Sequence, residues 1–285
     1  MYTLKIKNTN GETFELSHDY DNYYITDVQG LTPPATTINT AKAGIIDGTF
    51  FNSASVEERN IVITLVLNGD IEANRQRLYR IFPRKTPCTV YFKNANRDVK
   101  IQGYVETIEC DPFVKREKAQ ISIICPRPYF EDLATIYAEL SQSLALFEFP
   151  FSIEVDEPVP ISEITDYPIC EIVNEGDAEC GCVIDIDVHA TIQGLKIMNL
   201  QTEQFFFLDT AFVNHDRIRI NTNSGQMGVR MERGGSSFNI LNTVGENSTW
   251  LRLTPGLNRF TYTIDDGDTG DVDISITATT LYGGV

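Results

Sequence analysis

Two carboxylates and one histidine share a face of a predicted strand, and they are the first candidates for chemistry. Residues 182–190 alternate between apolar and polar side chains, so Asp185, Asp187 and His189 point to the side opposite Cys182. A divalent metal would need further ligands from other segments, and a glycosidase would need one carboxyl group with a raised pKa. We interpret the three residues as the solvent face of an acidic sheet, with no metal site.

Thiols and a histidine form a second candidate set. Cys170, Cys180, Cys182 and His189 are all ligand types that zinc accepts, but the C-x-C spacing is not the usual C-x₂₋₄-C pair. Cys180 and Cys182 would lie about 6.6 Å apart along a strand, at the far limit of disulfide geometry. The six cysteines of the chain are therefore expected to be free and mostly buried thiols.

Nucleophilic catalysis and calcium binding have little support in the sequence. The chain has three histidines and no G-x-S-x-G, H-E-x-x-H or P-loop pattern. The acidic run 265–273 does not fit an EF-hand, because a glycine falls on a ligand position in each starting register, and we expect a solvated hairpin turn there. We predict no catalytic residue, no cofactor and no metal, and hence no enzyme.

Trp250 is the single tryptophan and the obvious candidate for stacking against a sugar ring. Leu251 and Leu253 share the other face of the same short segment, so packing of Trp250 in the core or at a sheet edge is the competing interpretation. The sequence therefore leaves a carbohydrate-binding module open as an alternative function.

Basic side chains gather on and just after a predicted short helix. They form either a solvated face or a positive patch that contacts an acidic neighbour, which would steer assembly more than strengthen it. The cluster comprises Arg75, Arg77, Arg80, Arg84 and Lys85.

Charge divides the chain into two halves. Residues 1–132 hold 16 Lys and Arg against 17 Asp and Glu, whereas residues 133–285 hold 7 against 23. So few cations in the second half exclude nucleic acid as its ligand, since such proteins commonly neutralise roughly 6–10 phosphates. No run approaches the roughly 18 apolar residues of a membrane span. The N-terminus lacks the basic-then-apolar layout of a signal peptide, so we expect folding in a cytoplasm.

The first half reads as strands with one short helix. Residues 1–7 and 13–16 indicate a hairpin, and 61–67 a central strand apolar on both faces. Asp70 is placed to cap a helix that Pro83 ends. Further strands are expected at 23–28, 89–93, 98–109 and 120–125.

The period of the apolar residues changes between 131 and 147. Leu133, Ile136, Tyr137, Leu140, Leu144 and Phe147 follow a 3.6-residue spacing, which predicts a linker helix. After Pro150 short alternating strands are separated by Asn, Gly and Asp turns, which is typical of an antiparallel β-sandwich. The prediction is a mainly β chain with a domain at 1–132, a linker helix at 133–150 and an acidic sandwich domain at 151–285.

Several segments in order resemble the distal tail protein family of long-tailed phages with non-contractile tails. They are a turn similar to G-x-D-G at 44–48, an R-x-I-x-I strand that begins at Arg59, the helix at 77–83, segments 101–106 and 125–130, an L-x-P-G-x-N hairpin within 250–260, and a glycine-valine ending at 282–285. Residues 150–200 depart most from the family's pattern.

This resemblance implies a structural hub at the phage tail tip. The first domain would be a belt that closes into a ring of six copies, with a galectin-like sandwich outside it. The implied partners are other copies of the chain, the tail-tube protein, the tail-tip protein and a receptor-binding or arm protein, in a virion assembled in the host cytoplasm. The charge step agrees with this arrangement, because near-neutral domains can pack together whereas the acidic domains repel.

Overall fold

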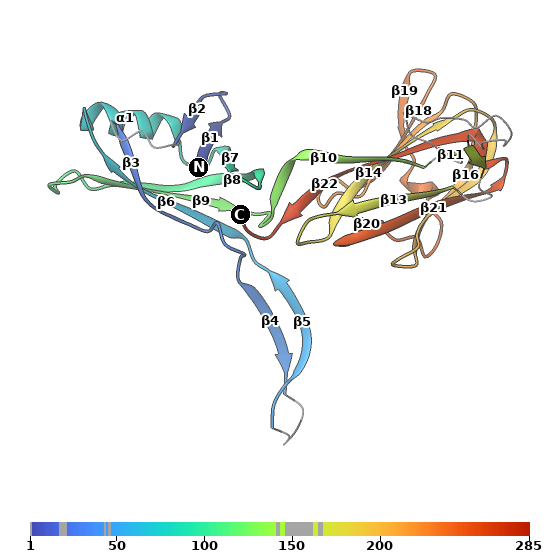
Figure 1. The fold of residues 1–285 in the computed structure, drawn as a ribbon, viewed down its shortest axis with the longest axis horizontal. Coiled ribbons are helices and arrows are strands. Elements are labelled where there is room, and N and C mark those ends of the chain that lie inside the picture. Colours follow the sequence, from blue (N-terminus) through green and yellow to red (C-terminus); the bar gives the residue numbers. More distant parts are fainter. Residues whose placement is uncertain are drawn as a thin grey trace, which may run out of the picture. The chain divides into compact units, whose positions relative to one another are not determined.

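The computed structural model describes residues 2–16, 22–42, 44, 47–140, 143–145, 162–164 and 168–285. The chain forms two compact units. Unit 1 comprises Met1–Leu133 and Leu281–Val285, and unit 2 comprises Ala134–Thr280. The chain therefore passes from one unit to the other twice, once in β10 (Phe130–Leu140) and once in β22 (Val272–Tyr282). The expected mainly β fold is confirmed (Figure 1).

Unit 1 is built on a curled antiparallel sheet. Its strands pair in the order β2-β1-β7-β8-β9-β6-β3, and the predicted hairpin, central strand and later strands are all present. The apolar residues of β6 explain its central place, since alternate positions from Ile61 to Leu67 are fully or almost fully buried. The strands are β1 (Thr3–Asn8), β2 (Thr13–Glu15), β3 (Tyr23–Gln29), β6 (Arg59–Leu67), β7 (Pro87–Lys93), β8 (Asp98–Cys110) and β9 (Lys118–Cys125).

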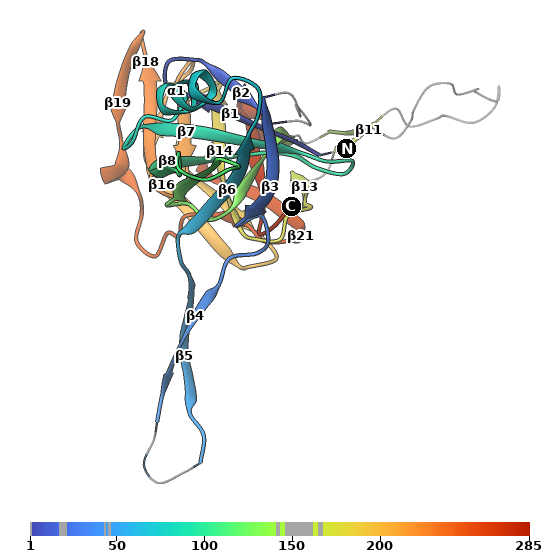
Figure 2. The same ribbon diagram turned by 90° about the vertical axis from the view of Figure 1, so that its left-hand side faces the viewer.

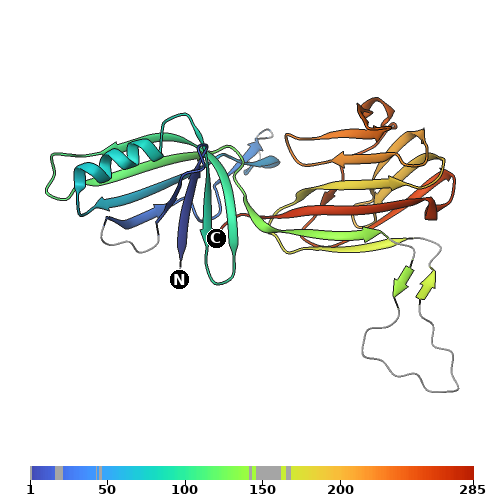
Figure 3. The same cartoon turned by 90° about the horizontal axis from the view of Figure 1, so that it is seen from above.

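The helix α1 (Ile71–Ile81) lies against this sheet (Figure 3). Asp70 caps it as predicted, since its Oδ1 accepts a hydrogen bond from Ala73 N at 3.1 Å. Leu78 and Ile81 are buried against the sheet, and the helix ends at Ile81, just before Phe82 and Pro83. Aromatic rings of Phe14 and Phe82 meet edge to face beneath it, with centroids 5.6 Å apart.

A two-stranded arm extends away from the rest of unit 1 (Figure 2). It consists of β4 (Thr36–Ala41) and β5 (Phe50–Val56), which pair only with each other among the described residues. These two strands are not among those predicted from the sequence. Nearly every residue of the arm is exposed, and an isolated two-stranded hairpin is marginally stable in water at best.

The predicted linker helix is wrong wherever the structure describes residues 133–150. Residues up to Leu140 continue β10, and 143–145 form β11 (Ser143–Ala145), which pairs with β12 (Ser162–Ile164). Pairing of β10 with β8 and β22 overrides the helical spacing, since a strand in a sheet gains ladder hydrogen bonds that the periodicity cannot reveal. Residues 141–142 and 146–150, including Phe147, lie outside the described part.

In its described part, unit 2 has two larger antiparallel sheets beside the β11–β12 pair. One has the order β19-β18-β17-β14-β22, with β20 also on β14, and the other has the order β13-β21-β15-β16. Alternate residues of β14 from Cys182 to Val188 are buried, as predicted. The bounds are β13 (Ile169–Asn174), β14 (Cys180–Val188), β15 (Ile192–Asn199), β16 (Gln204–Phe212), β17 (Arg217–Asn221), β18 (Gly228–Arg233), β19 (Ser236–Asn239), η1 (Leu241–Thr243), β20 (Arg252–Leu253), β21 (Gly256–Asp266) and η2 (Thr269–Asp271).

Two predicted hairpins in unit 2 are wrong, because the strands that flank each turn belong to different pairs. The acidic run 265–273 contains η2 and leads from β21 in one sheet to β22 in the other. The turn of the L-x-P-G-x-N motif leads from β20, which pairs with β14, to β21. Asn258 holds this second turn by accepting from Thr254 N at 3.0 Å and donating to Thr254 O at 2.8 Å.

The end of the chain is fixed to unit 1 by two arginines. Arg59 is buried and donates to Gly283 O at 2.5 Å, and Arg97 donates to Gly284 O and lies 4.2 Å from the Tyr282 ring centre. Val285 N donates to Leu31 O at 3.0 Å. The predicted C-terminal domain therefore loses its last residues to unit 1, and two motifs of the resemblance, R-x-I-x-I and the glycine-valine ending, meet in space.

No helix in the described ranges is both long and apolar enough to cross a membrane.

Candidate assembly interface

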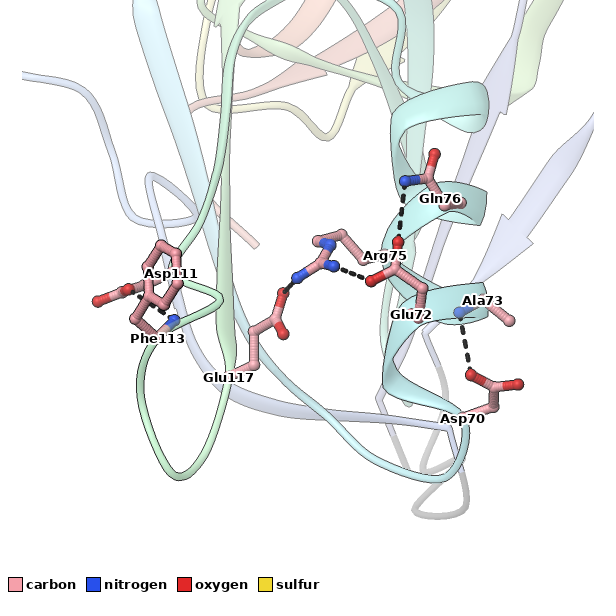
Figure 4. Close-up of polar contacts among 8 residues, drawn as sticks. All are labelled: Asp70, Glu72, Ala73, Arg75, Gln76, Asp111, Phe113 and Glu117. Atoms are coloured by element: carbon pink, nitrogen blue, oxygen red, sulfur yellow. Dashed lines mark hydrogen bonds and ion pairs between the residues drawn. The ribbon is translucent and has the colours of Figure 1, made fainter.

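The predicted basic cluster is divided by the fold. Arg75 is largely buried, and its guanidinium donates to Glu117 Oε1 at 2.8 Å and to Glu72 (Figure 4). Glu117 is itself buried at the base of the β8–β9 loop, so this ion pair fastens the loop to α1. Arg75 is thus a structural residue rather than part of a surface patch.

The remaining members of the cluster are exposed. Arg77 lies over the Phe14 ring at 5.8 Å, and Arg80 points to solvent from the same helix. Arg84 and Lys85 follow the helix, and Lys85 adopts a positive φ of 66° in the turn before β7. An inter-protomer contact of these four cations stays a prediction.

The β8–β9 loop carries a large apolar side chain into solvent. Phe113 is 98% exposed, and Val114 beside it is 44% exposed. The loop is locally ordered, because Asp111 Oδ1 accepts from Phe113 N at 3.4 Å in a tight turn (Figure 4). Two cations, Lys115 and Arg116, follow directly and are also exposed.

An apolar pocket of about 450 Å³ opens on unit 1. Its wall includes Ile25, Val28 and Leu31, which pack against the core but remain partly exposed. Tyr2 and Tyr24 stand exposed at its rim, and Glu15 is its charged residue. A hollow of this size and lining suits an apolar group with a polar or charged neighbour.

The arm has one apolar face. Thr36, Ile38 and Thr40 share that face by strand alternation, and their partners across the ladder are Val56, Ala54 and Phe51. A register shift between Asn39 and Thr40 brings Phe51 rather than Asn52 to this face. The opposite face is mostly polar, with a hydrogen bond from Thr37 Oγ1 to Glu57 at 2.5 Å and one from Asn39 Nδ2 to Ser53 at 3.1 Å, and it ends at the exposed Phe50 opposite Ala41.

The acidic strand face of unit 2 is neutralised by ion pairs. Asp185 accepts two hydrogen bonds from Arg219, at 2.6 and 3.1 Å, and Asp187 lies 3.1 Å from Arg217. His189 Nε2 is 2.7 Å from Asp273. The described residues contain no group of three or more His, Cys, Asp and Glu side chains that could hold a metal ion.

Trp250 packs within unit 2, and the cysteines are divided between the two units. Trp250 is half-buried, with its ring centre 5.1 Å from that of Phe206. All six cysteines are free, as predicted, and five are buried. Burial raises the pKa of Cys125 and of Cys182 to about 12, so these thiols stay protonated and unreactive near neutral pH.

Comparison with protein families identifies the chain. Residues 9–125 match the model of the phage tail protein RIFT-related domain, and residues 175–279 match that of the siphovirus-type tail component, C-terminal domain. The chain belongs to the siphovirus-type tail components. The resemblance to phage distal tail proteins inferred from the motifs is thereby confirmed.

A solved structure shares the fold of this tail component over almost the whole chain. The crystal structure of SPP1 Dit (gp 19.1), described as a paradigm of hub adsorption apparatus in Gram-positive infecting phages, is 12% identical, with a TM-score of 0.68 covering 99% of each chain. Chains of the phage P2 baseplate in its activated conformation, with Ca and with Sr, are 14% and 13% identical, with TM-scores of 0.45 and 0.47, covering 97% of this chain and 98% of those. No curated protein matches the sequence.

Sequence reasoning missed the most exposed apolar features of this tail component. The arm does carry a signal, since Thr36–Ala41 and Phe50–Val56 flank the predicted turn at 44–48 with short runs rich in β-branched, small and aromatic residues. Nothing in the sequence distinguishes Phe113 from a core aromatic, because exposure depends on the loop geometry that Glu117 and Arg75 fix.

Proposed function

We propose that this tail component is the hub of the phage tail tip, in which unit 1 closes into a ring of identical copies. The observation that carries the proposal is the apolar surface left open on unit 1. The arm exposes Ile38 and Phe51 by 62% and 66%. Monomeric proteins rarely leave such contiguous surface uncovered, so it is suited to a protein contact.

Charge supports the assignment of the ring to unit 1. Residues 1–132 are close to neutral, so copies can approach without strong repulsion, whereas residues 133–285 carry an excess of 16 acidic groups over the basic ones (23 against 7). A ring also covers sheet edges that a monomer leaves open. The ring faces would then contact the tail-tube protein and the tail-tip protein, and the acidic units a receptor-binding or arm protein. Assembly would take place in the host cytoplasm, and no catalytic step is part of this role.

Light scattering and negative-stain electron microscopy of the purified full chain test the ring. We expect one discrete oligomer with ring-shaped particles. The resemblance to distal tail proteins implies that it has six copies. The double variant Ile38→Ser with Phe51→Ser should lose the oligomer while keeping its melting temperature, because both side chains are exposed. Ser55→Thr on the polar face is the matched control. A wild-type chain that stays monomeric and shows no rings contradicts the proposal.

A carbohydrate-binding module in unit 2 is the second candidate function. Trp250 supports it only as an aromatic ring that is partly open to solvent, while its contact with Phe206 favours packing. A glycan array on the full chain, repeated with Trp250→Ala, separates the two. Binding that disappears in the variant would favour the sugar role, and an array without binding removes it.

A further inference from the structure

We propose that Phe113 of one copy inserts into the apolar pocket of unit 1 in a second copy, with Val114 packing at the rim. This inference rests on the proposed ring and names one of its contacts. The two surfaces lie on the same folding unit of every chain, and each copy therefore carries both halves of the contact.

The side chain of Phe113 has the character of an anchor residue. Its exposure of 98% means that it contributes almost nothing to the packing of its own chain. Water contact of a whole phenyl ring is unfavourable, at roughly 25 cal/mol per Å² of apolar surface. Interfaces gain most of their binding free energy from a few such aromatic side chains that fill pockets.

The loop presents Phe113 in a fixed position. Glu117 at its base is tied to Arg75 at 2.8 Å, and Leu67 N donates to Glu117 O at 2.9 Å, so the base is held by both α1 and β6 (Figure 4). Near the tip, the hydrogen bond of Phe113 N to Asp111 further restricts the loop. A loop that is ordered before binding loses less conformational entropy when the contact forms.

The pocket is a matching receptor. Its volume of about 450 Å³ and its wall of Ile25, Val28 and Leu31 leave part of the core open to solvent. Tyr2 and Tyr24 at the rim can contact an inserted ring, since aromatic pairs contribute about 0.5–1.5 kcal/mol beyond area burial.

Charge indicates how the two surfaces are oriented. Lys115 and Arg116 follow the anchor, and Glu15 lies in the lining of the pocket. Opposite charges at the edge of an apolar contact steer the approach of the partners and disfavour wrong pairings. The opposite charges of the loop and of the pocket lining therefore favour a second copy of this chain as the partner over an uncharged apolar one.

The contact must form between copies. The β8–β9 loop is fixed to α1, and its tip lies away from the two chain ends (Figures 1 and 3), whereas Tyr2 and Val285 both line the pocket. A contact that joins two different surfaces is heterologous, so each added copy leaves one free loop and one free pocket. Repetition of such a contact closes into a ring when the rotation between copies permits it.

The decisive experiment uses two full-length variants that each lack one half of the contact. Phe113→Ser removes the anchor and keeps the pocket, and Val28→Trp fills the pocket and keeps the anchor. We expect each alone to self-associate at least about 30-fold more weakly than wild type, because an anchor contributes about 2 kcal/mol or more. Mixed together, they should form a one-to-one dimer that grows no further. Phe238→Ser, which replaces a phenylalanine on β19 of unit 2 that is 47% exposed, is the control.

Two further variants keep the test decisive if Val28→Trp lowers the melting temperature. Lys115→Glu with Arg116→Glu should weaken association, and adding Glu15→Lys should restore it. Copies with Val114→Cys, which keep the Phe113 anchor, mixed with copies with Tyr24→Cys should give a covalent dimer on oxidation, which wild type does not give.

The outcomes separate this contact from the ring itself. If Phe113→Ser still forms wild-type rings, the proposed contact is overturned and the ring stands. If wild type is monomeric throughout, both are overturned. Binding of wild type but not Phe113→Ser to anionic phospholipid vesicles, with unchanged self-association, would assign the loop to a membrane surface and overturn the proposal.

Discussion

Arg59 is a buried cation that donates hydrogen bonds to four backbone carbonyls. It donates to Pro128 O at 2.7 Å, to Thr32 O at 2.8 Å, and to Gly30 O and Gly283 O. Its guanidinium also lies 4.5 Å from the centre of the Phe130 ring. One side chain thus joins the base of the arm, the segment before β10 and the chain end, which the planar fork of arginine allows and a lysine could not reproduce.

Replacing Arg59 should destabilise unit 1 strongly. Arg59→Met leaves several buried carbonyls without a donor, and we expect a loss of about 3 kcal/mol in the free energy of unfolding. Urea denaturation followed by circular dichroism measures it. Arg80→Met on the exposed side of α1 is the control and should stay within about 0.5 kcal/mol of wild type. A loss below about 1 kcal/mol for Arg59→Met would contradict the assigned role.

Asp216 gives unit 2 a pH-dependent contribution. Burial alone would raise the pKa of Asp216, but hydrogen bonds from Arg233 at 2.5 and 2.7 Å and from Val213 N at 2.8 Å outweigh it, so the pKa lies below its ordinary value. The native state then binds fewer protons than the unfolded state around pH 4. The contribution is therefore fully present above the unfolded pKa, about 3.9, and is lost as pH falls through the native value.

The gap between the melting temperatures of wild type and Asp216→Asn measures this contribution. We expect a constant gap from pH 7 to about pH 5 that narrows below about pH 4. Asp187→Asn, at a carboxylate on the exposed sheet face, should show a smaller gap throughout. A gap for Asp216→Asn that is the same at pH 3 and pH 7 would show that the carboxylate charge does not matter.

At the scale of elements, α1 depends on its first turn. Asp70→Ala removes the acceptor for Ala73 N, and we expect a loss of about 1 kcal/mol in the free energy of unfolding, whereas Asp70→Asn should lose much less. Because α1 holds the β8–β9 loop through Arg75, the same variant should also increase amide hydrogen exchange in residues 111–117. Unchanged exchange there would mean that the loop is ordered independently of the helix.

The spacing of apolar residues correctly predicted those elements in which the spaced residues are also the buried ones. β14 alternates strictly and is a strand, and Asp70 with Pro83 delimited α1 closely. The stripe from Leu133 to Leu140 has a helical period yet forms β10, where Leu133 and Tyr137 remain exposed. The pairing of β10 with strands distant in the sequence makes this segment a strand, and a short stretch of sequence carries no information about such pairing.

The same limit applies to the candidate interface. Arg75 was grouped with four other cations by spacing, but a carboxylate 42 residues later makes it structural. Phe113, the arm and the pocket become recognisable only as exposed apolar surface, which requires knowing what the rest of the chain covers.

At the scale of the molecule, the last residues of the chain stabilise unit 1, although all of unit 2 lies between them and the rest of unit 1 in the sequence. A chain that ends at Leu281 loses the carbonyls that Arg59 and Arg97 bind, so we expect unit 1 to lose about 3 kcal/mol or more. Trp250 is the single tryptophan and lies in unit 2, so its fluorescence reports unit 2 alone. Circular dichroism should then show an early transition that tryptophan fluorescence lacks.

Gly284→Ala provides a graded version of this truncation. A Cβ at this position would lie 2.7 Å from Pro33 Cδ, so the chain end must shift. The unfolding of unit 1 should move in the same direction as for the truncation, by a smaller amount. Coincident transitions for both probes in both variants would show that the chain end does not stabilise unit 1 separately.

Tyr2 and Val285 border the same apolar pocket. Affinity tags or fluorescent proteins fused to either terminus would therefore stand at the mouth of that pocket and hinder any side chain from entering it. A label for imaging or purification is better placed in the turn at 267–271 of unit 2, and a tagged monomer that assembles after protease removal of its tag would reveal how much a terminal tag had obstructed the pocket.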